Sequence, residues 1–419
     1  MRIVLLTQHF PPDPGPQSRR WGMLSAYFAG QGHQVDVVVP RWRSIEDWTA
    51  PQGVTVHTVR SWVQGIRLQR RLLNEALTAL GSLAEGWRLA RSEPRPDVVI
   101  ATVPALAALP IALAIGKPFR IPVVADIRDA WPDILEYWRE WGDTGTSEAG
   151  GHSRRSIHLL MSTLVPVAHA LYTAMERASD LVVTTTGSLA AVFRARGMAE
   201  VAAVRNTTFG LLAEPLPPPG ERRDGTLRVL YLGNIGRAQH LATALRAAVI
   251  AQQRGIPVRL RLIGEGAEAD AMRQFNERLG HPAEILPRAD ACDVPDHYRW
   301  ADTVLVSLRD WAGMQWTVPS KLYEVLHGGR HISASLRGEA AHIVTTSGAG
   351  DVVPPEDPEA LAQLWGELWQ DRSRLDTGSG GPEWIEQNAT TDDLSRGYLR
   401  LLERLHQRHR HGRRARSRG

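Results

Sequence analysis

The sequence predicts an α/β protein built from two Rossmann-like domains, and three observations support this prediction. Short apolar runs alternate with amphipathic stretches along most of the 419 residues, which is typical of parallel α/β units. A chain of this length exceeds one ordinary α/β core. A proline-rich stretch at 211–220 can continue neither a helix nor a central strand, so it separates the two alternating halves.

Each half contains its own series of expected strands. In the first half we expect strands at 3–7, 35–39, 54–57, 98–101, 123–125 and 181–184. In the second half we expect them at 227–232, 258–263, 303–306, 332–334 and 351–353. These series predict a first domain at 1–210, a semi-rigid linker at 211–220 and a second domain at 221–385.

The composition indicates a globular protein of a reducing compartment. Hydrophobic residues make up 43% and charged residues 22%, and no apolar run approaches the length of a bilayer span. The first residues lack the features of a signal peptide, and the single cysteine, Cys292, excludes an internal disulfide. We therefore expect a cytoplasmic protein.

The net charge of +4 does not indicate nucleic-acid binding, because it comes from the C-terminus. Residues 404–419 contain seven arginines and no acidic residue. We expect 407–419 to be a basic disordered tail, with contact to anionic lipids at the inner face of the membrane as the alternative. The stretches 66–91 and 154–175 carry arginines beside apolar residues, so each is either a helix at a membrane interface or a core-packing helix.

The first strand leads through a proline-rich loop containing Gly15 into a helix containing Arg19. Free N–H groups at the start of that helix could face a phosphate or a sugar, although an ordinary strand–helix turn fits equally well. The loop lacks the G-x-G-x-x-G pattern of dinucleotide-binding domains.

Charged and aromatic residues follow the strand at 123–125. Asp126, Arg128 and Asp129 come first, and they are either a structural ion-pair group or cleft residues that orient an acceptor hydroxyl. Trp131 and Trp138 follow in a polar segment. Such aromatic residues suit stacking on an acceptor, or packing of the segment on its own domain.

Two successive units of the second half have glycines directly after a strand. The residues are Gly233, Asn234 and Gly236 after the first strand, and Gly264 and Gly266 after the second. Glycine permits close approach of the backbone to a diphosphate, so both turns are candidates for donor binding.

The most informative segment begins at Pro319. Pro319 and Ser320 suit a helix N-terminus, and Lys321 adds a positive charge for a phosphate. Glu324 lies one turn further on, where it could accept hydrogen bonds from a ribose diol. The alternative is a capped surface helix with an incidental Lys–Glu pair.

Together these motifs resemble glycosyltransferase family 4, the retaining family with the GT-B fold. In particular they are similar to the branch that transfers N-acetylated amino sugars in surface-polysaccharide assembly. The resemblance extends over most of the chain and rests on Phe10-Pro11-Pro12, Arg128-Asp129-x-Trp131-Pro132, Tyr231-x-Gly233-Asn234-x-Gly236, Pro319-Ser320-Lys321-x-x-Glu324, Gly338-Glu339 and Pro355-Glu356-Asp357.

The resemblance implies two parallel sheets facing across a cleft, with a UDP-sugar on the second domain and the acceptor on the first. No metal would be needed, and a final helix at about 388–406 would pack back on the first domain. Glu324 would contact the ribose, and Lys321 with the backbone around Ser320 and Leu322 would meet the diphosphate. Gly15 would neighbour the diphosphate from the other domain.

The chain departs from the family pattern at Trp316, which stands where the first glutamate of the family's E-x7-E motif is expected. Positive groups aimed at the leaving diphosphate should dominate catalysis. We therefore assign catalytic roles to Lys321 and Arg237, and to Arg128 and Asp129 on the acceptor side. Arg19, Asp126, Trp131 and Trp138 are the expected acceptor-binding residues.

These assignments predict a retaining glycosyltransferase. Its donor would be a UDP-sugar such as UDP-GlcNAc, and its acceptor a hydroxyl of a lipid-linked saccharide or small molecule. Two alternatives remain open, namely a GT-B-fold UDP-sugar 2-epimerase and a catalytically silent subunit that binds a sugar nucleotide.

Overall fold

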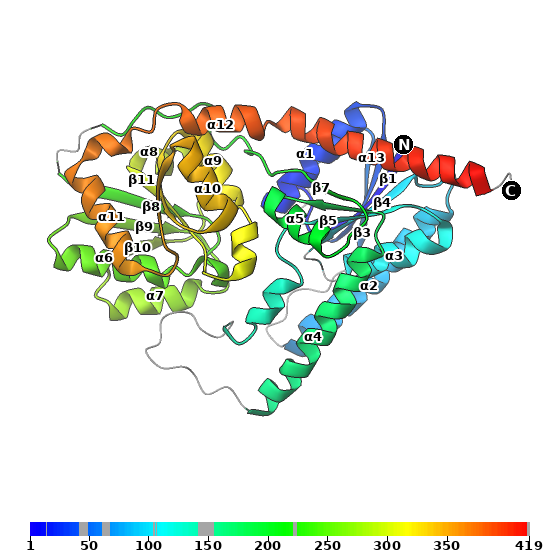
Figure 1. Cartoon of the computed structure of the whole chain (residues 1–419), viewed down its shortest axis with the longest axis horizontal. Helices are drawn as coiled ribbons and strands as arrows, with labels where there is room; N and C mark the ends of the chain where they lie inside the picture. Colours follow the sequence, from blue (N-terminus) through cyan, green and yellow to red (C-terminus); the bar gives the residue numbers. More distant parts are fainter. Residues whose placement is uncertain are drawn as a thin grey trace. The chain divides into compact units, whose positions relative to one another are not determined.

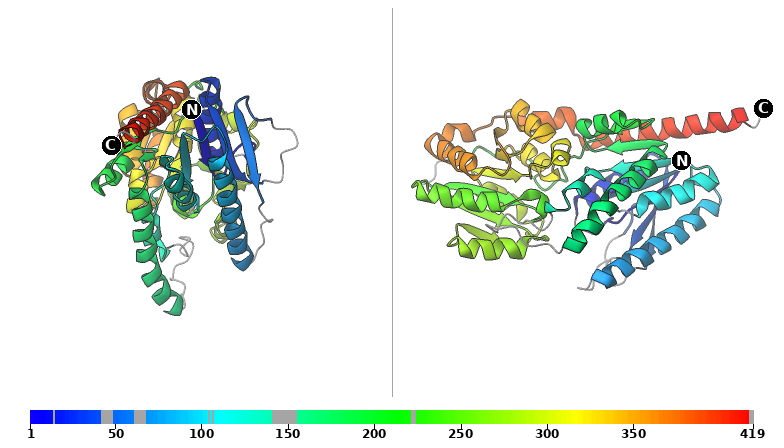
Figure 2. Two further views of the ribbon diagram at one scale, coloured as in Figure 1. Left: turned by 90° about the vertical axis from the view of Figure 1, so that its right-hand side faces the viewer. Right: turned by 60° about the horizontal axis from the view of Figure 1, so that its bottom comes forward.

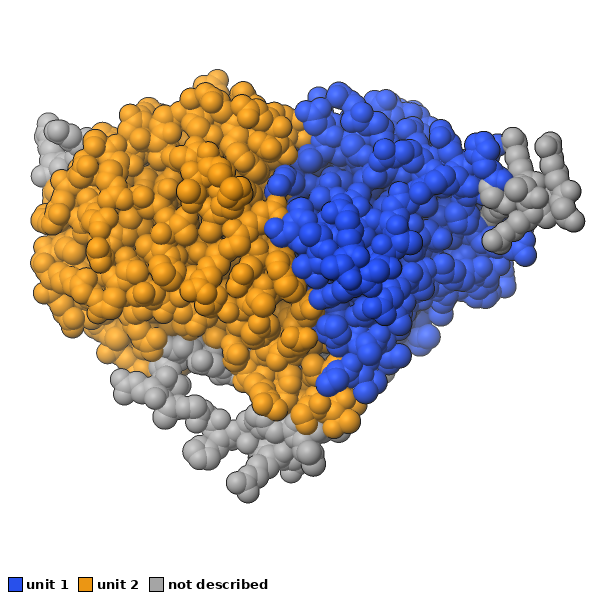
Figure 3. All heavy atoms as spheres, viewed as in Figure 1, with its two compact units in different colours: residues 1–132, 166–205, 391–419 blue, residues 133–165, 206–390 orange. Residues whose placement is uncertain are grey.

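The chain divides into two compact units in the computed structural model (Figure 1). The structure describes residues 1–13, 15–41, 49–60, 68–103, 105, 107–140, 155–220 and 224–416. The N-terminal unit comprises 1–132, 166–205 and 391–419, and the C-terminal unit comprises 133–165 and 206–390 (blue and orange in Figure 3). Residues 133–165, which we expected in the first domain, therefore group with the second.

The N-terminal unit contains a seven-stranded parallel sheet in the order β3-β2-β1-β4-β5-β6-β7. Its strands are β1 (Arg2–Leu6), β2 (Gln34–Pro40), β3 (Val54–Val59), β4 (Val98–Val103), β5 (Val123–Ile127), β6 (Leu181–Thr184) and β7 (Val201–Ala203). Its helices are α1 (Pro16–Gly30), α2 (Leu68–Arg91), α3 (Ala108–Phe119), α5 (Gly187–Ala195) and α13 (Thr391–Arg416). Helix α4 (Arg155–Arg177) contains residues assigned to both units.

Helix α13 packs on α1 and is longer than expected. The ring of Tyr398 on α13 lies 5.7 Å from Trp21 and 5.9 Å from Phe28, both on α1. Figure 2 shows α13 as one long helix that leads to the C-terminus. The prediction of a disordered tail from residue 407 is wrong as far as Arg416, because the backbone helix continues to that residue.

The C-terminal unit contains a six-stranded parallel sheet in the order β10-β9-β8-β11-β12-β13. Its strands are β8 (Leu227–Leu232), β9 (Val258–Ile263), β10 (Ala283–Leu286), β11 (Thr303–Ser307), β12 (His331–Ser335) and β13 (Gly350–Val353). Its helices are α6 (Ala242–Gln253), α7 (Ala269–Arg278), α8 (Val294–Trp300), α9 (Ser320–Gly328), α10 (Gly338–Ser347), α11 (Pro358–Gln370) and α12 (Gly380–Asn388). Short 3-10 helices include η1 (Asp133–Tyr137), η3 (Arg237–Gln239), η4 (Ala312–Trp316) and η5 (Arg372–Leu375).

Apolar cores cover both faces of this second sheet. Along β8, Leu230 belongs to one buried cluster, while Val229 and Tyr231 belong to another. Successive strand residues point to opposite faces, so the sheet is buried on both sides, as parallel sheets require. The predicted two-domain parallel α/β fold is therefore confirmed.

In both sheets the connections reverse direction beside the first strand. The reversal lies between β1 and β4 in the N-terminal unit and between β8 and β11 in the C-terminal unit. Ligands of open α/β sheets bind beyond the carboxyl ends of the strands at such a switch point. The fold alone therefore directs attention to the loops that follow these four strands.

The proline-rich stretch 211–220 forms hydrogen bonds with the C-terminal end of helix α9 and with Arg330, shortly after this end. The backbone N–H of Leu216 donates to Gly328 O at 3.0 Å, and the Arg330 guanidinium donates to Pro217 O at 2.5 Å. The predicted linker is thus part of the C-terminal unit rather than a free connection.

The chain enters the long part of the C-terminal unit at residue 206 and leaves it after residue 390. A hydrogen bond joins these two passages, because the Thr207 hydroxyl donates to Ala389 O at 2.5 Å. None of the helices in the described part of the chain combines the length and apolarity that a bilayer-spanning helix requires.

Candidate functional site

Lys321 lies at the switch point of the C-terminal unit. Its Nζ is 3.4 Å from the centroid of the Tyr231 ring, at the end of β8. The Nζ atom is buried and has no hydrogen-bond partner among the described residues. Burial holds the pKa of Lys321 well below its usual value. An amine enclosed without a counter-charge is suited to receive an anionic group.

Gly233, the first residue after β8, lies directly against this amine. A Cβ atom added to Gly233 would be 3.1 Å from the Lys321 Nζ, and the residue has a φ of 150°. The next residue, Asn234, is exposed, and its carbonyl accepts a hydrogen bond from the Tyr231 hydroxyl at 2.5 Å. The loop after β8 is therefore held over the lysine by Tyr231.

Gly264 and Gly266 pack directly against the backbone of this same loop after β8. A Cβ on Gly264 would lie 1.8 Å from Gly233 O, and one on Gly266 would lie 2.3 Å from Ile235 O. We expected these glycines to approach a diphosphate. The structure shows that their lack of a side chain lets two backbone segments touch, and their contact with a diphosphate stays a prediction.

The rest of the loop after β8 contains Gly236 and Arg237. Gly236 is buried, and its N–H donates to the Gln239 side chain at 3.2 Å. Arg237 is exposed, and its carbonyl accepts a hydrogen bond from the Arg309 Nε at 3.0 Å. The Arg237 backbone is therefore fixed, while its guanidinium lies in an exposed position.

Helix α9 begins immediately after Pro319 and brings Ser320, Lys321 and Leu322 into its first turn. Gly329, with a φ of 62°, ends the helix in the left-handed conformation that glycine favours. The first N–H groups of a helix have no acceptor within the helix and can bind an anion. The structure therefore brings together this helix start, the Lys321 amine and the loop at Gly233.

Glu324 on α9 is 3% exposed and already has one internal partner. Its Oε1 accepts a hydrogen bond from the Phe209 backbone N–H at 2.5 Å. The expected alternative of an incidental Lys321–Glu324 pair is not observed, since the Lys321 Nζ has no hydrogen-bond partner among the described residues. The carboxylate is thus fixed by the segment that enters the unit.

In the N-terminal unit, Asp126 is fully buried at the end of β5. Its Oδ1 accepts a hydrogen bond from the Tyr398 hydroxyl at 3.3 Å and lies 4.0 Å from an Arg20 nitrogen. Burial raises the pKa of Asp126, and the charges of Arg20 and Arg128 oppose that shift. Asp126 therefore fits the structural alternative, and its burial argues against the expected contact with an acceptor.

The other candidates in this unit are more accessible. Asp129 is exposed and Arg128 is half-buried, with the Arg128 carbonyl accepting a hydrogen bond from the Thr185 hydroxyl at 3.1 Å. Gly15 caps the start of α1, and Arg19 is half-buried on that helix. Asp129 is therefore the exposed charged side chain among these candidates.

A chain of hydrogen bonds that we did not predict crosses the switch point of the first sheet. The Gln17 amide donates to the Thr102 hydroxyl at 3.0 Å, and Thr102 donates to the Thr7 hydroxyl at 3.1 Å. Thr7 and Thr102 both follow apolar strand residues, and this shared position was the available sequence signal.

The aromatic segment after β5 also differs from the expectation. Trp131 belongs to the N-terminal unit, whereas 133–140 belong to the C-terminal unit. Trp138 is half-buried beneath the Arg139 guanidinium, 5.5 Å away. The segment 133–140 therefore does not pack on the first domain, which was the expected alternative, and the acceptor role of Trp138 stays a prediction.

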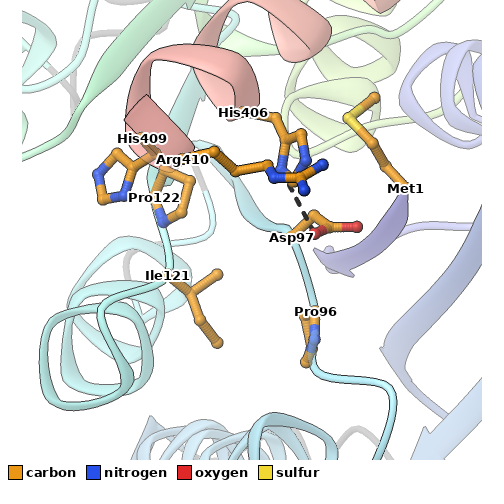
Figure 4. Close-up of a pocket in the computed structure, with 8 residues that line it drawn as sticks. All are labelled: Met1, Pro96, Asp97, Ile121, Pro122, His406, His409 and Arg410. Carbon is orange, nitrogen blue, oxygen red and sulfur yellow. Dashed lines mark ion pairs between the residues drawn. The ribbon is translucent and has the colours of Figure 1, made fainter. Parts of the chain in front are cut away.

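A pocket of about 390 Å³ lies at the opposite edge of the first sheet, beside the amino ends of β1, β4 and β5 (Figure 4). It is lined by Met1, Pro96, Asp97, Ile121, Pro122, His406, His409 and Arg410. The Asp97 carboxylate and His406 Nδ1 are 3.3 Å apart in it. Because ligands of such sheets bind at the carboxyl edge, this pocket is separate from the candidate site.

Comparison with known families agrees with this geometry. Residues 15–207 match the family model described as glycosyl transferase 4-like domain, and residues 226–371 match the one described as glycosyl transferases group 1. The chain is a glycosyltransferase. The second match contains the loop after β8 and helix α9, and the first contains Gly15, Arg128 and Asp129. No curated protein matches the sequence of this glycosyltransferase significantly.

Solved structures show that this glycosyltransferase has the GT-B architecture. A sucrose-phosphate synthase from Thermosynechococcus elongatus is similar with a TM-score of 0.71 and 15% identity, over 97% of this chain and 99% of that one. Anabaena HepE in complex with UDP-glucose has a TM-score of 0.65 and 14% identity, over 96% and 99%. WaaG, a glycosyltransferase of lipopolysaccharide biosynthesis, has a TM-score of 0.61 and 13% identity, over 96% and 99%.

Proposed function

We propose that this glycosyltransferase transfers a sugar, with retention, from a UDP-sugar to a hydroxyl group of a glycosylated acceptor. The observation that carries the proposal is the buried, unpartnered amine of Lys321 beside the start of α9. The diphosphate of a nucleotide would supply the negative counter-charge that the Lys321 amine lacks among the described residues. The similarity to Anabaena HepE, solved with UDP-glucose, supports the choice of nucleotide.

The proposed roles follow from the local chemistry. Lys321 and the N–H groups around Ser320 and Leu322 stabilise the departing UDP, because fixed positive groups lower the energy of a developing negative charge. Glu324 accepts hydrogen bonds from the ribose, and the exposed Arg237 assists the diphosphate. These positive groups take the place of a metal ion, so we propose that transfer is independent of metal.

On the acceptor side, we assign the orienting role to Asp129. It is the exposed carboxylate at the end of β5, whereas Asp126 is enclosed. Arg128 precedes it and Gly15 lies at the start of α1. By resemblance to the branch that uses N-acetylated amino sugars, we propose UDP-GlcNAc as the first donor to test.

A Lys321→Ala variant tests the donor assignment. With wild-type protein, a panel of UDP-sugars and saccharide acceptors should give UDP release that persists in EDTA. The variant should lose at least about 100-fold in kcat while its thermal unfolding stays cooperative. Exposed Arg288→Ala is a matched control that removes a positive charge of the same unit. Unchanged turnover by Lys321→Ala would contradict the assignment.

The same samples separate the two alternative functions. A 2-epimerase would convert the UDP-sugar without an acceptor, which NMR of the donor would reveal. A silent subunit would bind UDP-sugar without turnover by the isolated chain. Retention is tested by the anomeric configuration of the product relative to the donor.

We further propose that the acceptor is lipid-linked and that the protein contacts the membrane peripherally. Helix α4 supports this, since Leu164, Val167 and Leu171 are 50%, 52% and 57% exposed. They follow each other at three- and four-residue spacing and therefore lie along one face. An apolar helix face can bury itself in a lipid interface.

Flotation with vesicles of phosphatidylglycerol and phosphatidylcholine tests this contact. Wild-type protein should float with the vesicles, and a variant with Leu164, Val167 and Leu171 changed to serine should remain below. The control changes Val352 of β13, which is 36% exposed and lies outside both candidate membrane stretches, to serine. Absence of wild-type flotation would remove the membrane contact and leave the transfer reaction unaffected.

A further inference from the structure

A second aromatic contact lies beside the candidate donor site, within the C-terminal unit. The ring of Tyr137 stacks on that of Trp311, with centroids 5.2 Å apart and an interplanar angle of 19°. The Tyr137 hydroxyl accepts a hydrogen bond from the Ala312 backbone N–H at 2.8 Å. The indole N–H of Trp311 donates to the Glu140 carboxylate at 2.5 Å. Two residues of the 133–140 segment thus hold one tryptophan.

Trp311 lies in the loop that follows a central strand of the second sheet. It lies just after β11, the strand that forms the switch point together with β8. The loop that contains it continues through η4 directly to Pro319 and helix α9. Trp311 therefore lies in the segment of chain that leads directly to Lys321.

Trp311 also contacts a cation. The Arg309 guanidinium lies 5.1 Å from the centroid of the Trp311 ring, so the indole has a cation–π contact in addition to the stacked Tyr137 ring. The Arg309 backbone N–H donates to Ala238 O at 2.8 Å. Arg309, which contacts Trp311, therefore connects the loop after β11 with the loop after β8.

We propose that Tyr137 and Glu140 are positioning residues that fix Trp311, and with it the β11–α9 loop, in the geometry needed to bind the sugar of the donor. This inference rests on the proposed function, since it assigns the donor to this switch point. It gives the segment 133–140 a donor-side role in place of the acceptor-side role expected from the sequence. The two residues act through Trp311 and need not touch the donor.

Four variants separate the contacts. Tyr137→Phe removes the hydroxyl and keeps the stacked ring, whereas Tyr137→Leu removes both. Glu140→Gln keeps an oxygen acceptor for the indole N–H, whereas Glu140→Ala removes it. Tyr27→Phe on α1 is the matched control for the loss of a hydroxyl, because Tyr27 belongs to the other unit.

Positioning predicts a division between the kinetic constants. Tyr137→Leu and Glu140→Ala should raise the donor KM about 10-fold and change the preference between UDP-glucose and UDP-GlcNAc, with Kd for UDP itself nearly unchanged. Tyr137→Phe should give a smaller rise, and Glu140→Gln should restore wild-type values. Tyr27→Phe should behave as wild type.

Hydrogen exchange provides a readout that does not depend on activity. Peptides covering 308–319 should exchange faster in Tyr137→Leu than in wild type, and at the wild-type rate in Tyr27→Phe. Unchanged exchange would overturn the positioning role. Faster exchange with an unchanged donor KM and an unchanged preference between the two UDP-sugars would also overturn the inference. In either case, an active wild-type enzyme would leave the proposed function standing. Wild-type protein that binds no UDP would instead refute the proposed function.

Discussion

The carboxylate of Glu324 is bonded to the backbone N–H of Phe209 at 2.5 Å. Phe209 lies in the segment by which the chain enters the C-terminal unit, and Glu324 lies on the helix that carries Lys321. The residue proposed to bind the ribose is therefore also the residue that anchors the entering segment. Donor binding and the conformation of that segment should depend on the same carboxylate.

Changing Glu324 should accordingly affect both stability and donor binding. Glu324→Ala leaves the Phe209 N–H without its acceptor, which costs about 1–3 kcal/mol of unfolding free energy. Glu324→Gln retains an oxygen acceptor, so it should preserve most stability while weakening UDP binding. Urea unfolding and calorimetric titration with UDP measure the two effects. Equal losses of stability in both variants would show that the Phe209 contact is unimportant.

UDP binding should be coupled to protonation of Lys321. In the free protein the pKa of Lys321 lies well below its usual value of 10.5, so the amine is neutral between the lowered pKa and 10.5. The bound diphosphate favours the ammonium form, and binding should therefore take up a proton and weaken as pH rises through this range. Calorimetry in buffers with different ionisation enthalpies measures the uptake.

Lys321→Met is the control for that coupling. It should abolish the additional proton uptake, and it should not reduce stability, because it removes a buried amine that lacks a partner. In the wild type, the free energy of unfolding should rise with pH between the lowered pKa of Lys321 and 10.5, because the unfolded chain still binds a proton there that the folded chain has lost. Identical proton uptake by wild type and Lys321→Met would assign the proton to another group.

Gly264→Ala should disrupt the loop over the lysine. Its Cβ would lie 1.8 Å from Gly233 O, and the φ of 153° is itself unfavourable for alanine. We expect a loss of more than about 2 kcal/mol of stability together with weaker UDP binding. Gly397→Ala on α13 is the control, because nothing lies within 4 Å of its added Cβ. It should be neutral or stabilising by about 0.5–1 kcal/mol.

Asp126 and Asp129 should separate structure from activity. Asp126→Ala removes a fully buried carboxylate that contacts Arg20 and accepts a hydrogen bond from the Tyr398 hydroxyl, and it should destabilise the protein by about 3–5 kcal/mol. Asp129→Ala removes an exposed carboxylate and should lower turnover with little change in stability. Thermal unfolding and UDP release distinguish them. A reversal of this pattern would exchange their proposed roles.

Strand positions and the donor-side helix could be predicted from local sequence. Every strand expected from an apolar run is present in the structure. Strands β7 and β10 were not expected, because both are short edge strands with partly exposed residues. Lys321 was found because proline and serine mark a helix start and a lysine beside that start supplies a positive charge for a phosphate. Such signals are contained within a few neighbouring residues.

The remaining features depend on contacts between distant parts of the chain. Gly264 resembles a ligand-binding glycine in sequence, and only its approach to Gly233 reveals its packing role. Likewise, Tyr137 and Trp311 are separated by more than one hundred residues, and no local pattern predicts that they stack. The burial of Asp126 depends on Tyr398 from the last helix.

The bond between Thr207 and Ala389 has a consequence for the history and engineering of the molecule. It brings together the two ends of residues 206–390, so this stretch has the form of a domain insertion whose entry and exit coincide. A short peptide could therefore join position 389 to position 207. Circular permutants of the C-terminal unit could then open at any exposed turn while retaining the Lys321 region, which would make the two halves exchangeable between related enzymes.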